Sequence, residues 1–177
     1  MPAITCLIGT GSNSCFFDGD IVRQEVTGLD YILGDEGSGA YFGRKLLKLY
    51  MYKKMPDHLL QDFEREYSIS KNEILQNVYM KPYANVYLAS FIRFINKHQS
   101  DPFFVEMIKK GLNEFIDIFV KSYDGYNSMP VHFVGSIPFF FENSLKEVLS
   151  ENNVLMGKII KEPIDELVEY HIRKSNK

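Results

Sequence analysis

Five small or polar residues in a row, Gly9-Thr10-Gly11-Ser12-Asn13, stand near the start of the chain between two apolar runs that predict short strands. Glycine has no Cβ, so the backbone at Gly9 and Gly11 can take a positive φ and a ligand can approach it closely. Amide N–H groups in such a turn can converge on an anion, and the hydroxyls of Thr10 and Ser12 add donors. The stretch therefore suggests a phosphate site, with an ordinary hairpin turn as the simpler alternative.

A second glycine-rich stretch, residues 28–39, follows closely and leads into a helical pattern. Two such elements so near each other in the sequence suggest one cleft built from both. Asp35 lies in the second stretch, directly before the predicted helix. Its carboxylate is either a ligand-binding group or an acid that complements the helix dipole.

The elements that must position these turns follow from the apolar periodicity. Three short strands are predicted to form an antiparallel meander, and helices and two more strands follow. The predicted strands are residues 3–9, 13–18, 21–26, 131–136 and 158–161, and the predicted helices are 37–53, 57–66, one from about 71, 84–98, 102–120, 138–151 and 163–173. The pattern indicates an α/β protein, in which a mixed sheet carries helices on both faces.

Composition excludes several classes of protein. The chain has 177 residues, 45% of them hydrophobic and 24% charged, which is typical of one globular domain. Its net charge of −3, without a basic stripe, argues against nucleic acid as a partner. No apolar run approaches the length of a membrane span and no signal-peptide pattern occurs, so we expect no membrane partner and a cytoplasmic location.

The metal-ligating residue types are few. Cys6 and Cys15 both fall in predicted strands, where free cysteines are usually small buried apolar residues. The histidines show no spacing typical of metal ligands; they are His58, His98, His132 and His171. We therefore expect no metal bound directly by histidine or cysteine.

Three motifs carry a resemblance to a known family: residues 7–14, 33–39 (Leu-Gly-Asp-Glu-Gly-Ser-Gly) and 131–136 (Val-His-Phe-Val-Gly-Ser). At these residues the chain resembles the actin/hexokinase/Hsp70 superfamily. It is most similar to the N-acetylglucosamine kinase-like branch of the BadF/BadG/BcrA/BcrD ATPase family, which includes the ATPase activators of benzoyl-CoA reductase. The resemblance implies a ribonuclease H-like mixed sheet, one lobe of an actin-like ATPase fold. Residues 1–177 would be a single C-terminal lobe with a helical insertion at about 55–100, and the N-terminal lobe would be absent.

The resemblance also implies roles for particular residues. The residues expected to contact ATP are Gly9, Thr10, Gly11, Gly111, Gly135 and Ser136. Gly111 is included for its position on a helix and not for a motif. The residues expected to contact the sugar are Ser12, Asn13, Gly28, Leu29 and Asp35. Family members commonly have Trp or another large residue and then Gly where this chain has Leu29 and Asp30, which leaves the choice of sugar open.

No catalytic residue is assigned, because the family's catalytic aspartate lies in the N-terminal half; Asp18 is the other carboxylate near the turn, and nothing supports it as a base. The implied activity is ATP-dependent phosphorylation of an amino sugar at its 6-hydroxyl, with ATP and Mg²⁺ as cofactors. The expected partners are the amino sugar, the missing N-terminal lobe and a second copy in a homodimer. Without that lobe we expect the chain to be inactive.

Two alternatives stay open. The first is an ATP-driven activator or regulatory ATPase that phosphorylates no sugar. The reductase activators hold an iron–sulfur cluster through cysteines at helix starts, whereas Cys6 and Cys15 lie in strands. The second is a nucleotide-binding or scaffold remnant without catalysis.

Overall fold

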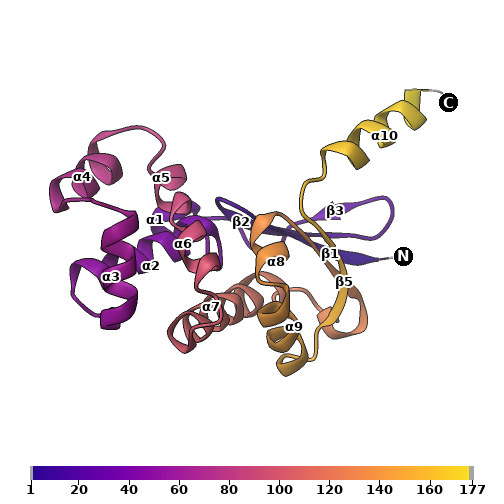
Figure 1. The fold of residues 1–177 in the computed structure, drawn as a ribbon. Helices are drawn as coiled ribbons and strands as arrows, with labels where there is room; N and C mark the ends of the chain where they lie inside the picture. Colours follow the sequence, from indigo (N-terminus) through magenta and orange to yellow (C-terminus); the bar gives the residue numbers. More distant parts are fainter. Residues whose placement is uncertain (1, 176–177) are drawn as a thin grey trace.

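The computed structural model describes residues 2–175, within which five strands form one mixed sheet in the order β3-β2-β1-β4-β5 (Figure 1). The strands are β1 (Ala3–Ile8), β2 (Ser12–Phe17), β3 (Val22–Arg23), β4 (Pro130–Val134) and β5 (Leu155–Ile160). β1 to β3 pair antiparallel in chain order, whereas β4 runs parallel to β1 and β5 parallel to β4. The predicted mixed sheet of three antiparallel strands and two more is confirmed.

One face of the sheet is buried and the other is largely open. Side chains alternate between the two faces along a strand, and in β1 Ile4, Cys6 and Ile8 are fully buried. On the other face Leu7 is 53% exposed and Phe17 is 41% exposed. The prediction of helices on both faces therefore holds for one face only within the described residues.

The helices that cover the buried face come mainly from the second half of the chain. α7 (Pro102–Phe115) continues into a π-helical turn, η2 (Ile116–Val120), and α8 (Ser136–Phe140) and α9 (Glu142–Glu151) follow β4. η2 and α8 contact β1, and α9 packs against both β5 and α7. The apolar residues that recur through 103–120 face the core as predicted; Phe104, Ile108, Leu112, Phe115 and Ile116 are fully buried. Burial of one such side chain contributes about 1.5–3 kcal/mol.

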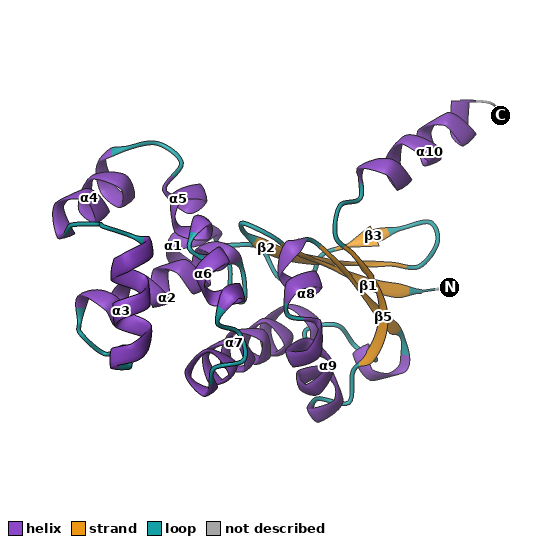
Figure 2. Cartoon of the chain, viewed as in Figure 1, coloured by secondary structure: helices purple, strands orange, loops and turns teal. Residues whose placement is uncertain are grey.

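A second group of helices gathers at the end of the molecule farther from the sheet (Figures 1 and 2). Its members are α3 (Asp57–Glu66), α4 (Lys71–Leu75), the π-helical turn η1 (Gln76–Met80), α5 (Ala84–Ser90) and α6 (Ile92–Lys97). They surround the buried rings of Phe63, Phe91 and Phe94. The capping box predicted at Ser70 is present, because Ser70 and Glu73 each bond the other's backbone N–H.

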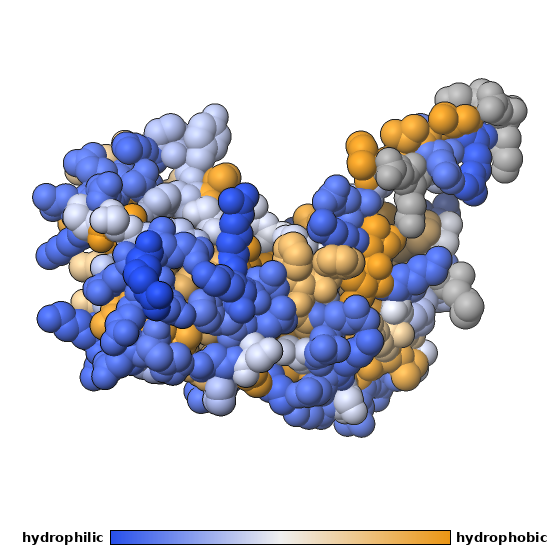
Figure 3. Space-filling model, viewed as in Figure 1, coloured by the Kyte–Doolittle hydropathy of each residue, from blue (hydrophilic) through white to orange (hydrophobic). Residues whose placement is uncertain are grey.

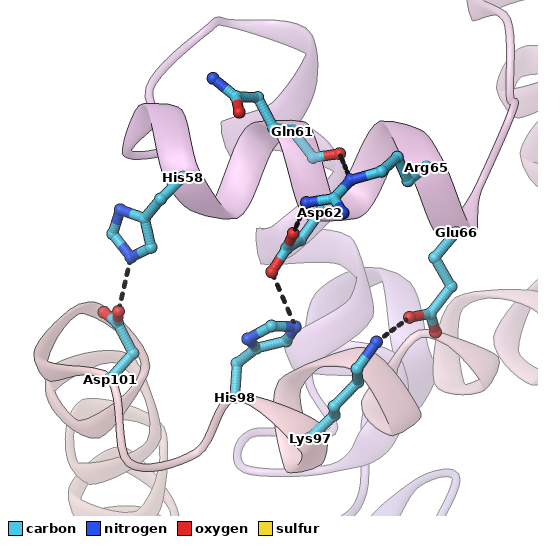
Figure 4. A network of polar contacts seen from close by, with 8 residues as sticks. All are labelled: His58, Gln61, Asp62, Arg65, Glu66, Lys97, His98 and Asp101. Carbon is cyan, nitrogen blue, oxygen red and sulfur yellow. Dashed lines mark hydrogen bonds and ion pairs between the residues drawn. The ribbon is translucent and has the colours of Figure 1, made fainter.

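Polar side chains tie α3 to the neighbouring helices (Figure 4). His58 Nε2 lies 2.7 Å from Asp101 Oδ2, and Lys97 Nζ lies 2.8 Å from Glu66 Oε2. These contacts join α3 to the start of α7 and to α6. The region expected from about 55 to 100 therefore forms a helical layer of its own, linked to α7; its status as an insertion stays a prediction.

Several element limits differ from those predicted. The strand expected at 21–26 is reduced to Val22–Arg23, and the last strand begins earlier, at Leu155. The helix expected at 84–98 is divided at Phe91, and the one expected at 138–151 is divided at Phe141. Both rings are almost fully buried, against Phe63 and Phe42 respectively, and turning the backbone there places them in the core.

Four further elements complete the described chain, and α2 (Gly39–Met51) is the longest of them. Three of them are the unpredicted short helix α1 (Asp30–Leu33), the 3₁₀ turn η3 (Tyr126–Ser128) and the last helix α10 (Ile164–Ser175), which lies close to its predicted place and projects away from the sheet (Figure 1). α2 follows α1 and corresponds to the helix predicted at 37–53. None of the helices in residues 2–175 combines the length and apolar character needed to cross a bilayer.

Candidate functional site

The candidate site starts at the tight turn between β1 and β2. Gly9 donates its N–H to the carbonyl of Gly11 at 2.9 Å, and Ile8 pairs with Ser12 on either side. Within the described residues the N–H groups of Thr10 and Gly11 have no acceptor, and Thr10 is exposed. A Cβ added at Gly9 would meet no atom within 4 Å. The turn therefore presents free donors to open space, as an anion site requires.

The start of α2 holds this turn in place. Gly39 and Ala40 donate their N–H groups to the carbonyls of Gly9 and Thr10, at 2.8 and 3.0 Å. Ser38 is the N-cap, and its hydroxyl accepts from the N–H of Tyr41 at 3.1 Å. The turn carbonyls and the Ser38 cap satisfy first-turn donors of α2 that would otherwise lack partners. An anion at this place would meet the N–H groups of the turn and not those of the helix.

Asp35 connects the two glycine-rich stretches. Its Oδ1 accepts the backbone N–H of Ser12 at 3.0 Å, and the Ser12 hydroxyl donates to the carbonyl of Glu36 at 2.8 Å. Asp35 is only 8% exposed and has a left-handed φ of 58°. A Cβ at Gly11 would lie 2.9 Å from Asp35 Oδ2, so glycine is what lets the carboxylate lie against the turn. The two glycine-rich stretches are thus joined in one hydrogen-bonded unit, and the single cleft built from both stays a prediction.

The remaining residues expected to contact the sugar lie beside this unit. Asn13 Oδ1 accepts from Gln24 Nε2 at 2.6 Å, and a Cβ at Gly28 would lie 3.6 Å from Asn13 Nδ2. Leu29 is 57% exposed. Ser12, Asn13, Gly28 and Asp35 therefore lie together, and Leu29 lies next to them along the chain.

Gly135 brings the third motif to the same place. Its φ is 126°, and a Cβ there would lie 2.3 Å from the carbonyl oxygen of Ile8 and 3.3 Å from the nitrogen of Gly9. Its N–H donates to the carbonyl of Ile160 at 2.9 Å, and Ser136 follows directly. The turns after the parallel strands β1 and β4 thus touch. In open α/β sheets, ligands bind in the crevice outside such carboxyl ends.

Gly111 lies one layer behind the turn. It is buried, and a Cβ there would come within 2.7 Å of the rings of both Phe42 and Tyr41. Close packing of α7 on α2 is therefore enough to explain glycine at this position. Its carbonyl lies near Gly37, where an added Cβ would be 3.1 Å away. The expected nucleotide contact of Gly111 stays a prediction.

Three polar side chains fix α2 to α7 near the turn. Tyr41 donates its hydroxyl proton to Glu114 and accepts from Lys45, and Lys45 Nζ lies 3.6 Å from Glu114 Oε2. Burial and the carboxylate of Glu114 raise the pKa of Tyr41 well above its usual range. Burial also lowers the pKa of Lys45, although Glu114 opposes that shift. The β1–β2 turn is therefore held by α2, which is joined to α7 by packing and by these polar contacts.

The two cysteines do not form a metal site. Cys6 pairs across the sheet with Ser14 and Cys15 with Thr5, so the two thiols point to opposite faces. Burial raises the pKa of the Cys6 thiol well above its usual value, which keeps it protonated. Within the described part of the chain, no three His, Cys, Asp or Glu side chains group so that they could hold a metal ion.

Sequence reasoning missed two residues that shape this site. Gln24 holds Asn13, and Arg44 Nη1 donates to the carbonyls of Tyr31 and Ile32. In the sequence Gln24 is one polar residue among several, and Arg44 is one of several basic residues in a helix. No signal in spacing could have separated them from their neighbours.

Comparisons with solved structures find proteins of similar fold. Two proteins with this fold are each named "putative N-acetylglucosamine kinase". The one from Porphyromonas gingivalis is 36% identical, has a TM-score of 0.90, and is matched over 96% of this chain and 60% of its own. The one from Chromobacterium violaceum is 18% identical, with a TM-score of 0.57 and coverage of 89% and 55%, and shows the fold alone.

No family model matches the sequence, and no curated protein matches it. The chain thus spans 60% of the length of the P. gingivalis protein. The likeness to that protein agrees with the mixed α/β fold described above.

Proposed function

We propose that this chain is the C-terminal lobe of an ATP-dependent sugar kinase of the N-acetylglucosamine kinase type, in the BadF/BadG ATPase family. The fold would be ribonuclease H-like, one lobe of an actin-like ATPase, and the strand order β3-β2-β1-β4-β5 supports that assignment. The observation that carries the proposal is the contact between the β1–β2 turn, Asp35 and the turn at Gly135. The β1–β2 turn and the Asp35 carboxylate thereby lie close enough to contact ATP and a sugar that are bound side by side.

The roles follow from which groups are free. The N–H groups of Thr10 and Gly11, with the Thr10 hydroxyl and the open space at Gly9, would receive the ATP phosphates. Gly135 and Ser136 would lie against the adenosine, and Gly111 would lie on its other side. Phosphoryl transfer depends mostly on positioning and charge neutralisation, which such donors provide.

The sugar would lie on the side of Asp35. Its Oδ1 is used by Ser12, so Oδ2 is the atom left to accept a sugar hydroxyl. Asn13, Gly28 and Leu29 would complete this wall, with Ser12 as the residue that aims Asp35. Mg²⁺ would enter with ATP, since it keeps phosphate and water ligands and needs few protein carboxylates.

The catalytic base and the first phosphate motif would come from an N-terminal lobe, in a cytoplasmic protein that can form a homodimer. The exposed apolar side chains of α10 support contact with another lobe or another copy. Ile164, Leu167, Val168 and Ile172 are each about half exposed or more, on the helix that projects at the upper right of Figure 3. Exposed apolar residues that gather in this way mark interaction surfaces.

The test is a phosphorylation assay on this chain together with the proposed N-terminal lobe. We expect ATP-dependent formation of a 6-phosphate from N-acetylglucosamine or a close amino sugar, and none from residues 1–177 alone. ATP hydrolysis with every amino sugar left unphosphorylated would contradict the proposal and favour the regulatory ATPase. The iron–sulfur form of that alternative lacks support, because Cys6 and Cys15 point to opposite faces of the sheet.

A further inference from the structure

The guanidinium of Arg44 bridges two consecutive carbonyls of the short helix α1. Its Nη1 donates to the oxygen of Tyr31 at 2.5 Å and to that of Ile32 at 2.7 Å. These carbonyls belong to the last turn of α1, where no partner within the helix exists. A cation at a helix C-terminus is also favourable for the helix dipole.

α1 has little else to hold it. It contains four residues, none of them buried, and Ile32 and Leu33 are 67% and 74% exposed. Apart from the partly buried Tyr31, which packs against the core, its side chains add little packing. A single helical turn is unstable in water by itself, so the bridge from Arg44 is a main support of residues 28–34.

The other end of the bridge is rigid. Arg44 follows Gly43, the position at which α2 packs against α5. A Cβ at Gly43 would lie 1.8 Å from the carbonyl oxygen of Leu88. Leu46 and Leu47, on the same helix, are buried. The first turn of this helix also holds the β1–β2 turn. One helix, α2, therefore places both the phosphate turn and the segment 28–34.

We propose that Arg44 is a positioning residue of the acceptor site, which fixes residues 28–34 beside Asn13 and Asp35 so that they form the sugar-binding wall. This inference rests on the proposed function. A polar acceptor needs partners at fixed places, because a hydroxyl left unpaired loses a hydrogen bond. Lysine cannot replace the planar fork of arginine without loss of this geometry.

The kinetic test compares Arg44→Ala and Arg44→Lys with wild type in the complete protein, with N-acetylglucosamine as the probe. Loss of a charge-assisted bridge predicts a KM for the sugar that rises about tenfold in Arg44→Ala, with an intermediate rise in Arg44→Lys. The KM for ATP should stay within about twofold, because Arg44 does not contact the phosphate turn. Lys48→Ala, an exposed cation one turn further along α2, is the matched control and should change neither constant.

A second readout does not depend on activity. Amide hydrogen exchange of residues 30–34 should quicken about tenfold in Arg44→Ala but not in Lys48→Ala, while exchange in residues 39–51 stays as in wild type. Unchanged exchange in residues 30–34 would overturn the bridge, and faster exchange with an unchanged KM for the sugar would overturn the acceptor role. If wild type phosphorylates no amino sugar, the proposed function and the acceptor role both fail, and the exchange result still reports the bridge.

Discussion

Asp35 Oδ1 accepts the backbone N–H of Ser12 at 3.0 Å, across 23 positions of sequence and from a backbone with φ of 58°. One carboxylate therefore pins the first residue of β2 to the segment that leads into α2. Its two oxygens have different surroundings, since Oδ1 accepts the N–H of Ser12, whereas Oδ2 accepts no hydrogen bond within the described residues. Structure and function at Asp35 can be separated by the choice of substitution.

Asp35→Asn should keep the fold and lose the activity. Asparagine tolerates a left-handed φ, and its amide oxygen can still accept from Ser12. We expect the free energy of unfolding to change little, whereas phosphorylation of N-acetylglucosamine should fall about 10- to 100-fold with loss of the charged acceptor. Urea denaturation and initial rates measure the two effects.

Asp35→Ala is the companion variant. It leaves the buried N–H of Ser12 without an acceptor, which costs about 1–3 kcal/mol of unfolding free energy. Full activity in Asp35→Asn would remove Asp35 from the sugar site, and it would then be only a structural link.

Alanine substitutions at Gly9 and Gly135 distinguish an effect on ligand binding from an effect on packing. A Cβ at Gly9 meets no protein atom, so Gly9→Ala should leave stability within about 1 kcal/mol of wild type. It would, however, place a methyl group in the space proposed for the ATP phosphates. We expect weaker ATP binding, measured as a higher KM for ATP, with an unchanged KM for the sugar.

Gly135→Ala should behave in the opposite manner. Its Cβ would lie 2.3 Å from the carbonyl oxygen of Ile8, at a φ that alanine rarely adopts. We expect a loss of about 1–3 kcal/mol in unfolding free energy, from strain and overpacking. If Gly9→Ala had no effect on ATP use, the β1–β2 turn would not be the phosphate site.

The sequence predicted local turns and caps better than it predicted the limits of the elements around them. Strand, turn and cap signals depend on neighbours within a few residues, so the β1–β2 turn, the capping box at Ser70 and the helix start near Ser38 lie close to where the pattern placed them. The meeting of Asp35 with Ser12 agrees with the predicted cleft, because both stretches are rich in glycine and close in sequence.

Features decided by long-range packing could not be predicted in this way. The helix breaks at Phe91 and Phe141 arise where aromatic rings turn into the core, and period alone gives continuous helices there. α1 depends on Arg44, ten or more positions away, and its own residues carry no helical pattern. The open second face of the sheet could not be predicted because the usual alternation of polar and apolar residues is weak here: the exposed Leu7 and Phe17 are as apolar as their buried neighbours.

The crossing of α2 and α5 predicts a large effect from one methyl group. Gly43→Ala would place a Cβ 1.8 Å from the backbone carbonyl of Leu88, which cannot move without displacing α5. Overpacking of this kind costs about 1–3 kcal/mol or more, although alanine is the better helix former by about 1 kcal/mol. We expect a net loss of stability in urea, whereas Lys48→Ala should stay near wild type. A stabilised Gly43→Ala would mean that α5 lies farther from α2 than the structure has it.

The last prediction concerns acid and the contact between α3 and α7 (Figure 4). Asp101 Oδ2 lies 2.7 Å from His58 Nε2, and Oδ1 accepts the N–H of Phe103 at 2.9 Å. The hydrogen bond with His58, and next that from Phe103, lower the pKa of Asp101 below its ordinary value. A carboxylate with a lowered folded-state pKa stabilises the fold at pH values above its unfolded pKa of about 3.9. This contribution is lost as the pH falls through the lower, folded-state pKa.

Urea denaturation of wild type and Asp101→Asn at several pH values between about 6 and 2 measures this contribution. Asparagine keeps the N-cap of α7 but carries no charge. Wild type should therefore be the more stable near pH 6, and the difference should shrink through the acid range and vanish at its lower end. His58→Ala removes the hydrogen bond that lowers the pKa of Asp101 most. Its loss of unfolding free energy relative to wild type should also shrink as the pH falls, but it should be smaller than the loss in Asp101→Asn. A difference that stays constant with pH would mean that Asp101 supports α7 through its cap alone and that the contact with His58 contributes nothing.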